Sequence, residues 1–234
     1  MRLGIMQPYI FPYAGYWQLI HAVDQFVILD DVNFIKRGFI NRNSILVNGK
    51  ACRFSIPVKK ASQNKLICEC EVLFPKEEKQ KFLKTITLAY KNAPVFTEVF
   101  PMLEQIVKYD ITDLTDFALN SMIVLCDYLN IGTKFIKSSE LVKRKDVIGQ
   151  ERIIEICKVL NADEYINPCG GKQLYSKLRF EEEGIHLYFL EPAMSDIVYK
   201  QFGNPFVPNL SIIDLLMFNT PDKIKEFLQK FELV

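Results

Sequence analysis

The stretch that decides the fold is Leu3-Gly4-Ile5-Met6-Gln7-Pro8-Tyr9-Ile10-Phe11-Pro12-Tyr13-Ala14-Gly15-Tyr16, which runs on into Trp17-Gln18-Leu19-Ile20. It predicts an apolar strand over residues 2–7, a proline-framed aromatic loop, and a helix over residues 14–24 that opens around Gly15. Proteins of the α/β class build ligand sites in such loops, at the carboxyl ends of parallel strands. We therefore expect the functional site to lie here.

Strands and helices alternate along most of the chain. A second strand is predicted over residues 25–30, because the run Phe26-Val27-Ile28-Leu29 is apolar on both faces, as in a central parallel strand. Asn48-Gly49, between two strand-like runs, predicts a hairpin with a type I′ turn. The later elements are predicted as strand 134–137, helix 150–160, strand 164–167, helix 172–182, strand 186–190, and short helices 211–218 and 221–231.

Residues 76–130 have a helical period instead. They predict three helices, over residues 76–91, from about residue 94 to residue 107, and over residues 112–129, the last with Thr112 as its N-cap. The fold class is therefore α/β: a Rossmann-like, mostly parallel sheet with helices on both faces, a β-hairpin and a helical insertion. We expect residues 1–75 and 131–234 to form a nucleotide-binding-like α/β core and residues 76–130 to form the insertion.

The composition indicates a globular protein and argues against several classes of function. The 234 residues are 49% hydrophobic and carry a net charge of +1, without the long basic block of a duplex-binding protein, so we expect no nucleic-acid partner. Lys143-Arg144-Lys145 is expected to be a short solvated turn. No apolar run suits a signal peptide or a membrane span, so we expect a cytoplasmic protein. Six scattered cysteines without a C-x-x-C pair favour reduced thiols and no metal site.

Asp30 and Asp31 directly follow the second predicted strand. Adjacent side chains on an extended segment point to opposite faces, so at most one of the two carboxylates is expected to face a ligand crevice. A general base, a metal ligand for a nucleotide diphosphate, and a cap for the following turn all fit this pair. We take both residues as candidate catalytic groups.

The segment from Lys36 to Asn43 carries the next candidate binding groups. Arg37 or Arg42 can hold a phosphate in a bidentate manner, and Lys36 and Asn41 lie in the same segment. Aromatic residues are interleaved with these polar ones. The segment therefore suits a nucleotide-linked sugar better than a protein surface.

The loop Asn167-Pro168-Cys169-Gly170-Gly171-Lys172 follows another predicted strand. Paired glycines let backbone N–H groups approach a phosphate, and Lys172 would add a charge at the positive end of the predicted helix 172–182. An ordinary strand-to-helix turn is the alternative. We expect Gln7, Tyr13, Tyr16 and Lys172 to line one pocket, with further binding residues at Tyr9, Gly15, Asn167, Gly170 and Gly171.

A later loop contains Gln201 and Asn209 among glycine and proline residues. Their amide groups are candidates for reading sugar hydroxyls or the edge of a uracil or thymine base. Equally, the loop could serve only to cap the sheet. The sequence does not decide between these two roles.

Five blocks of the sequence resemble the WbqC-like family, bacterial proteins associated with O-antigen and other surface-polysaccharide gene clusters. The blocks are residues 4–16, 26–32, 36–43, 166–172 and 201–211. The resemblance implies a transferase that acts on a nucleotide-linked amino sugar, by N-acyl or aminoacyl transfer, in surface-polysaccharide biosynthesis. Its partner would be a small-molecule nucleotide sugar, and acyl-CoA or a nucleotide is the candidate cofactor. A non-catalytic module that binds a nucleotide sugar is the alternative.

The predicted order of elements is also similar to the class I nucleotidylyltransferase fold of pantothenate synthetase and class I aminoacyl-tRNA synthetases. In that resemblance Tyr13-Ala14-Gly15-Tyr16 falls where those enzymes carry His-x-Gly-His. Tyrosine has an ordinary pKa near 10, so a phenol donates a hydrogen bond but supplies no cation near neutral pH. A nucleotidyltransferase-like enzyme with Tyr13 as a candidate catalytic residue is therefore a further alternative.

Overall fold

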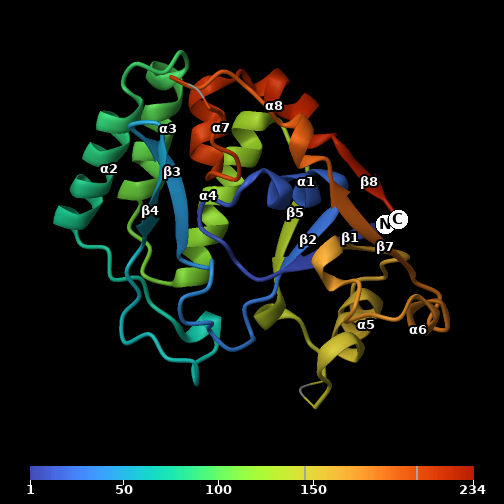
Figure 1. Ribbon diagram of the computed structural model, residues 1–234. Coiled ribbons are helices and arrows are strands. Elements are labelled where there is room, and N and C mark those ends of the chain that lie inside the picture. Colours follow the sequence, from blue (N-terminus) through green and yellow to red (C-terminus); the bar gives the residue numbers. More distant parts are fainter. Residues whose placement is uncertain (145, 204) are drawn as a thin grey trace.

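The computed structural model describes residues 1–144, 146–203 and 205–234 (Figure 1). A six-stranded main sheet has the order β5-β2-β1-β6-β7-β8, and a separate hairpin pairs β3 with β4. The strands are β1 (Arg2–Met6), β2 (Gln25–Ile28), β3 (Arg42–Val47), β4 (Lys50–Ser55), β5 (Lys134–Lys137), β6 (Glu164–Pro168), β7 (His186–Pro192) and β8 (Phe231–Leu233). The helices are α1 (Ala14–Ala22), α2 (Lys76–Tyr90), α3 (Phe96–Lys108), α4 (Leu114–Leu129), α5 (Gly149–Val159), α6 (Lys177–Glu181), α7 (Ile212–Phe218) and α8 (Pro221–Leu228).

The order of the main sheet reverses beside its first strand. β1 pairs in parallel with β2 on one side and with β6 on the other. The chain adds β2 and β5 on the first side before it crosses back to add β6 and β7, and the edge strand β8 runs antiparallel to β7. In open α/β sheets the crevice outside the carboxyl ends, at such a reversal, is the usual place for a ligand. The predicted α/β class with a mostly parallel sheet is confirmed.

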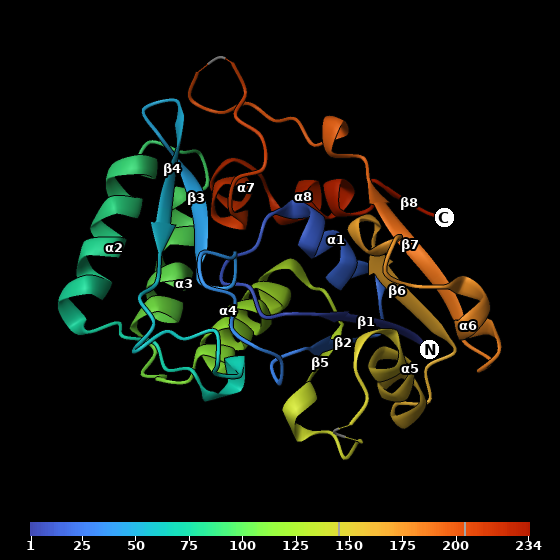
Figure 2. The ribbon, with the colours of Figure 1, turned by 60° about the horizontal axis from the view of Figure 1, so that its bottom comes forward.

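Helices cover both faces of this sheet (Figure 2). On one face, Leu3 and Tyr165 of the sheet pack with Ile153 of α5 and Phe180 of α6. On the other face, α1, α4 and α8 share a larger apolar core that includes Phe26 and Ile166 of the sheet. The strands are apolar on both faces because helices bury them on both sides.

The hairpin stands apart from the main sheet, next to α2 (Figure 1). Asn48 and Gly49 have φ values of 49° and 74°, the two positive values that a type I′ turn requires. The ring of Phe54 in β4 lies 5.2 Å from that of Phe82 in α2, between ring centroids. One face of the hairpin is thereby buried against the helical segment.

Three helices occupy residues 76–129, as the sequence predicts. Their buried side chains belong to the same apolar core as those of α1 and β2. The expected N-cap of α4 at Thr112 is wrong, because α4 begins after Asp113. The Asp113 carboxylate accepts a hydrogen bond from the Asp116 N–H at 2.8 Å, and aspartate is among the strongest N-cap residues.

Two further boundaries differ from those that the sequence predicts. Residues 169–171 form a single 3₁₀ turn, and α6 begins only after Ser176, whose Oγ accepts from the Arg179 N–H. Lys172 is therefore not the first residue of a long helix. The last predicted helix ends at Leu228, and Phe231–Leu233 alternate as a strand that pairs with β7.

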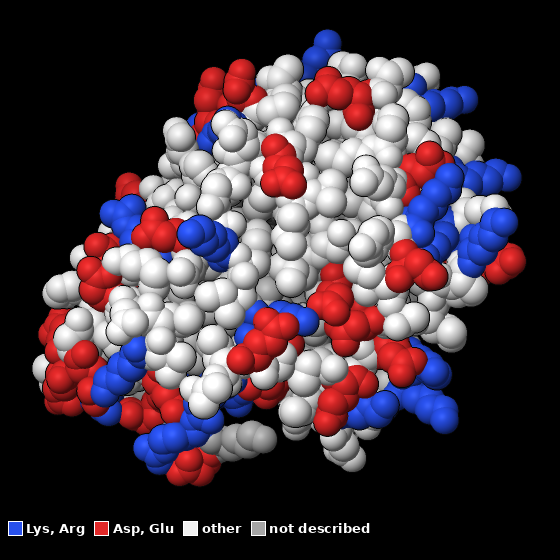
Figure 3. Space-filling view, turned by 180° about the vertical axis from the view of Figure 1, so that it is seen from behind, with Lys and Arg blue, Asp and Glu red and all other residues white. Residues whose placement is uncertain are grey.

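The surface carries charges of both signs. Figure 3 shows Lys and Arg interleaved with Asp and Glu on the face opposite to that of Figure 1, with no extended block of one sign. None of the described helices combines the length and the apolar character needed to cross a membrane. Arg144 is exposed, in line with the expected solvated turn, but the side chain of Lys143 is only 6% exposed, and Lys145 lies outside the described residues.

Asp214, the third residue of α7, is a buried carboxylate that holds several segments together. It accepts hydrogen bonds from Tyr90 Oη at 2.8 Å, Tyr199 Oη at 2.6 Å and Gln201 Nε2 at 2.8 Å. Tyr90 Oη also accepts from the Leu46 N–H of β3, at 2.8 Å. The network therefore ties α7 to α2, to the hairpin and to the loop that precedes α7.

Asp214→Ala is expected to lower the free energy of unfolding by about 2–4 kcal/mol, because it removes the acceptor of two phenols and of one of the two hydrogen bonds donated by the Gln201 amide. Urea denaturation measures this loss. Asp127→Ala, at an exposed position of α4, is the matched control and should change stability by no more than about 0.5 kcal/mol. Equal stabilities for the two variants would show that the network does not hold these segments.

Candidate functional site

A pocket of about 910 Å³ opens at the carboxyl edge of the sheet, beside the reversal of strand order. Four regions form it: the ends of β1, β6 and β7; the first loop with α1; the segment 35–44 with Arg53 of β4; and Asn209 in the loop before α7. Its volume suits a small-molecule ligand. The lining residues are Met6, Gln7, Pro8, Tyr9, Tyr13, Gly15, Tyr16, Leu19, Ile35, Arg37, Gly38, Phe39, Ile40, Arg42, Asn43, Ser44, Arg53, Pro168, Cys169, Gly170, Leu190, Pro192 and Asn209.

An aromatic cluster forms one side of the pocket. The ring centroid of Tyr9 lies 6.4 Å from that of Tyr13, 5.9 Å from that of Tyr16 and 6.0 Å from that of Phe39. Tyr16 Oη donates to the backbone oxygen of Gln7 at 2.8 Å. Burial raises the pKa of all three tyrosines, so they are neutral phenols at physiological pH.

Gly15 is required by the position of the Tyr13 ring. A Cβ atom at residue 15 would lie 2.6 Å from Cε2 of Tyr13. Real contacts of this kind are not that short, so any larger residue would displace the ring. The group that lies close to Gly15 is thus the Tyr13 ring, which belongs to the pocket wall.

Three arginines line the pocket, and all of them come from the segment between β2 and α2. Arg37 lies in the loop after β2, Arg42 is the first residue of β3, and Arg53 lies in β4. Among the described residues that line the pocket there is no aspartate, glutamate or histidine. The pocket is therefore positively charged, which favours an anionic ligand.

Only the first part of the glycine turn after β6 lines the pocket. Pro168, Cys169 and Gly170 line the pocket, whereas Asn167, Gly171 and Lys172 are outside the lining set. Asn167 is buried, where it accepts from Tyr165 Oη at 2.8 Å and donates to the Pro168 oxygen at 3.0 Å. Lys172 forms an ion pair with Glu191. The structure therefore brings Gln7, Tyr13 and Tyr16 together but leaves Lys172 outside.

The carboxylate pair that follows β2 lies outside the pocket lining. Asp30 is buried and accepts from the N–H and Oγ of Ser139, at 2.9 and 2.7 Å; burial raises its pKa and these bonds oppose the rise. Asp31 forms ion pairs with Lys143 at 2.7 Å and Arg152 at 2.5 Å. Burial would raise the Asp31 pKa, but the bond to Lys143 and the charge of Arg152 hold it below the ordinary value. Both carboxylates thus have partners within the protein.

The remaining predicted residues divide into two groups. Asn209 lines the pocket, whereas Lys36 is exposed outside it. Asn41 is buried and donates to the Ile56 oxygen at 2.7 Å, and Gln201 is bound to Asp214 and to the backbone of Val207. These two amides hold loops in place.

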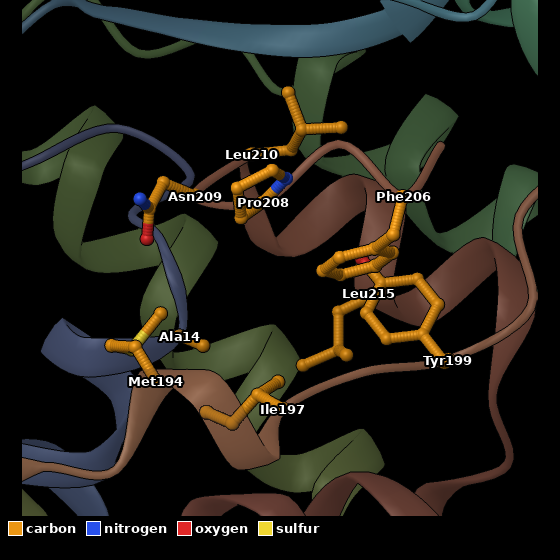
Figure 4. A pocket seen from close by; sticks show the side chains of 9 residues that line it. All are labelled: Ala14, Met194, Ile197, Tyr199, Phe206, Pro208, Asn209, Leu210 and Leu215. Carbon is orange, nitrogen blue, oxygen red and sulfur yellow. The ribbon is translucent and has the colours of Figure 1, made fainter. Parts of the chain in front are cut away.

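Asn209 also borders a second, much smaller cavity (Figure 4). Its volume is about 20 Å³, enough for about one water molecule. Most of the side chains around it are apolar, and the rings of Tyr199 and Phe206 lie together at one side of it, with centroids 5.1 Å apart. This cavity is too small to hold a ligand.

Arg53 was not predicted as a site residue, although the sequence contains a signal for it. The Asn48-Gly49 turn fixes the register of the hairpin, in which Ser44 pairs with Arg53 and Arg42 pairs with Ser55. Counting outward from the turn therefore places Arg53 on the same face as Arg42. Cys169 also lines the pocket, and it is the one thiol among the lining residues that the structure describes.

Gly171→Ala is expected to destabilise the protein by about 1–3 kcal/mol, because its Cβ would lie 1.9 Å from Nδ2 of the buried Asn167. Gly170→Ala is the matched control, since nothing lies within 4 Å of a Cβ built there. Thermal or urea denaturation compares the two variants. If Gly171→Ala were as stable as Gly170→Ala, Asn167 would not fix the turn.

The sequence comparisons agree with the resemblance seen in the sequence blocks. The model of the WbqC-like protein family matches residues 7–226. Uncharacterized protein Rv1507c of Mycobacterium tuberculosis (strain ATCC 25618 / H37Rv) is 27% identical over 232 residues, which cover 97% of each chain. No solved structure is a significant match to the chain. The family model spans nearly the whole sequence and includes the pocket residues from Gln7 onward, so the protein belongs to the WbqC-like protein family.

Proposed function

We propose that the pocket binds a nucleotide-linked amino sugar and that the protein is a transferase acting on it, by N-acyl or aminoacyl transfer, in surface-polysaccharide biosynthesis. The observation that supports this proposal is the pairing of three arginines with an aromatic wall at the reversal of strand order. Arginine binds phosphate through a planar, bidentate guanidinium group, and aromatic rings stack on a nucleobase. A nucleotide sugar offers both partners in one molecule.

Phe39 is the group that we assign to the nucleobase. Its side chain lines the pocket although the residue is 68% exposed, and among the described residues Tyr9 is its one close aromatic neighbour. An aromatic ring with a free face at a pocket mouth is suited to stacking. The deeper groups Gln7 and Tyr13, at the end of β1 and the start of α1, would then contact the sugar.

The transfer step needs a group that accepts the proton of the sugar amine. Asp30 and Asp31 are held by Ser139, Lys143 and Arg152, so we do not assign this role to them. Near the ends of β1 and β6 the pocket is lined by the phenols of Tyr9, Tyr13 and Tyr16 and by the thiol of Cys169. Burial, and then the nearby Cys169, raise the Tyr13 pKa, so the phenol acts as a hydrogen-bond donor. With acyl-CoA as the donor, the thiolate that leaves would take up the proton of the amine.

A binding module without catalysis is the second candidate function. It is favoured by the lack of carboxylate and imidazole groups among the lining residues that the structure describes. The nucleotidyltransferase-like alternative, with tyrosines in place of two histidines, needs a cation near Tyr13. The cations that line this pocket are the guanidinium groups of Arg37, Arg42 and Arg53.

Thermal-shift measurements with a nucleoside-diphosphate amino sugar, ATP and acyl-CoA separate these functions. We expect the nucleotide sugar to raise the melting temperature. A ligand present at a hundred times its Kd raises the free energy of unfolding by about 2.7 kcal/mol. An additional shift with acyl-CoA would support acyl transfer, and a shift with ATP alone would support nucleotidyl transfer. If none of the three raised the melting temperature, the proposed function would be wrong.

Phe39→Ala is expected to weaken nucleotide-sugar binding by about 5- to 100-fold, the loss typical of one base–aromatic stack. Phe39 is largely exposed, so the melting temperature of the unbound protein should be nearly unchanged. Leu88→Ala, a similarly exposed apolar position in α2, is the control for binding. Isothermal titration calorimetry measures both variants, and equal affinities would exclude the stacking role.

A further inference from the structure

We propose that Arg37, Arg42 and Arg53 form a binding site for the diphosphate of the ligand that works without a divalent metal ion. The nucleotide part of that ligand rests on the proposed function. The anion site itself rests on the arrangement of the three guanidinium groups. Its class of ligand is a pyrophosphate ester or any oxyanion of similar charge.

The three pocket arginines differ from the other arginines of the protein in that they form no ion pair with a carboxylate of the described chain. Arg2, Arg144, Arg152 and Arg179 each form an ion pair with a carboxylate. Within the described part of the chain, no ion pair is formed by the three arginines that line the pocket. The protein thus supplies counter-ions for its other arginines and leaves three positive charges together in one cavity.

The hairpin register gathers two of these charges on one face. Arg42 pairs with Ser55 and Ser44 with Arg53, so the two arginines are diagonal neighbours across the strands. Diagonal neighbours are roughly 7–8 Å apart, within reach of long side chains. Like charges at this separation repel each other, and a multivalent anion between them would convert the repulsion into attraction.

Arg42 also has an unsatisfied donor. Its Nε is buried, and no acceptor within the described structure lies at hydrogen-bonding distance. A buried charged donor without a partner is costly, and an oxyanion along that edge of the guanidinium group would supply the missing acceptor.

Arg37 lies in an unusual backbone conformation. Its φ of 63° is in the left-handed region, which glycine and asparagine adopt much more readily than arginine. Strain of this kind is found preferentially at ligand sites. Arg37 therefore occupies a position whose backbone conformation glycine or asparagine would adopt more readily.

The donor set of the pocket suits a phosphate without a metal ion. Mg²⁺ at a diphosphate is held by carboxylates as well as by phosphate oxygens, and the described lining residues include no carboxylate. Likewise, the part of the chain that the structure describes contains no cluster of three or more histidine, cysteine, aspartate or glutamate residues suited to a metal. The three guanidinium groups would neutralise the phosphate charge instead.

The test is calorimetric titration of the full chain with uridine diphosphate and with inorganic pyrophosphate, both in EDTA. Both probes are expected to bind, and added Mg²⁺ should not tighten the binding. Arg42→Gln, Arg53→Gln and Arg37→Asn should each weaken both probes by tenfold or more, about 1.4 kcal/mol. The exposed, paired Arg144→Gln is the matched control and should change affinity by less than about twofold.

Arg37→Asn keeps the experiment decisive if another variant folds poorly, because asparagine tolerates the left-handed conformation and the side chain is exposed. Binding that requires Mg²⁺, or that survives all three substitutions, would overturn the anion site while leaving the proposed function standing. Arginine-dependent binding of pyrophosphate without binding of uridine diphosphate or of the nucleoside-diphosphate amino sugar would keep the anion site and overturn the proposed function. Failure of both probes to bind, in EDTA and with added Mg²⁺ alike, would overturn both.

Discussion

The structure depends on the hydrogen bonds that other segments form with the backbone of the buried first loop, residues 8–13. Ile10 and Phe11 are fully buried, and a buried loop has no water to bind its polar groups. The Ile10 N–H donates to the Ile40 oxygen at 2.9 Å, and the Phe11 oxygen accepts from Asn43 Nδ2 at 2.6 Å and from Ser211 Oγ at 2.8 Å. Segments far apart in the sequence are thereby fixed against the end of β1, and together they enclose the pocket.

The main sheet and the hairpin contribute different chemistry to that pocket. The ends of β1, β6 and β7 supply Gln7, Cys169 and apolar groups, which define where a ligand lies. The positive charges come from Arg37, Arg42 and Arg53, in the long connection between β2 and β5. A sheet edge common to many α/β proteins thus acquires its positive charge from a connecting segment, as expected when function is carried by connections on a shared scaffold.

The sequence predicted those features that depend on neighbouring residues. It predicted that strands alternate with helices, that Asn48-Gly49 forms a type I′ turn, and that Gln7 and Tyr13 line one pocket. All three features follow from local patterns and from the parallel order of the strands. The partners of Asp31 did not follow, because Lys143 and Arg152 lie more than 100 residues further along the chain. The pairing of Lys172 with Glu191 joins residues 19 positions apart in different elements, and it was not visible in the sequence either. The helix predicted from residue 172 begins only after Ser176, the N-cap of α6.

The carboxyl edge of the sheet is divided by these ion pairs. Outside β2 and β5, the carboxylates of Asp30 and Asp31 are bound to Ser139, Lys143 and Arg152, so the protein satisfies its own charges there. Outside β1, β6 and β7, the arginines of the pocket have no such partners within the described chain. Charges that are already paired offer little to a ligand, since binding would have to break the existing pairs. One half of the edge therefore has paired charges that fix the loops, and the other half has the unpaired positive charges of the proposed anion site.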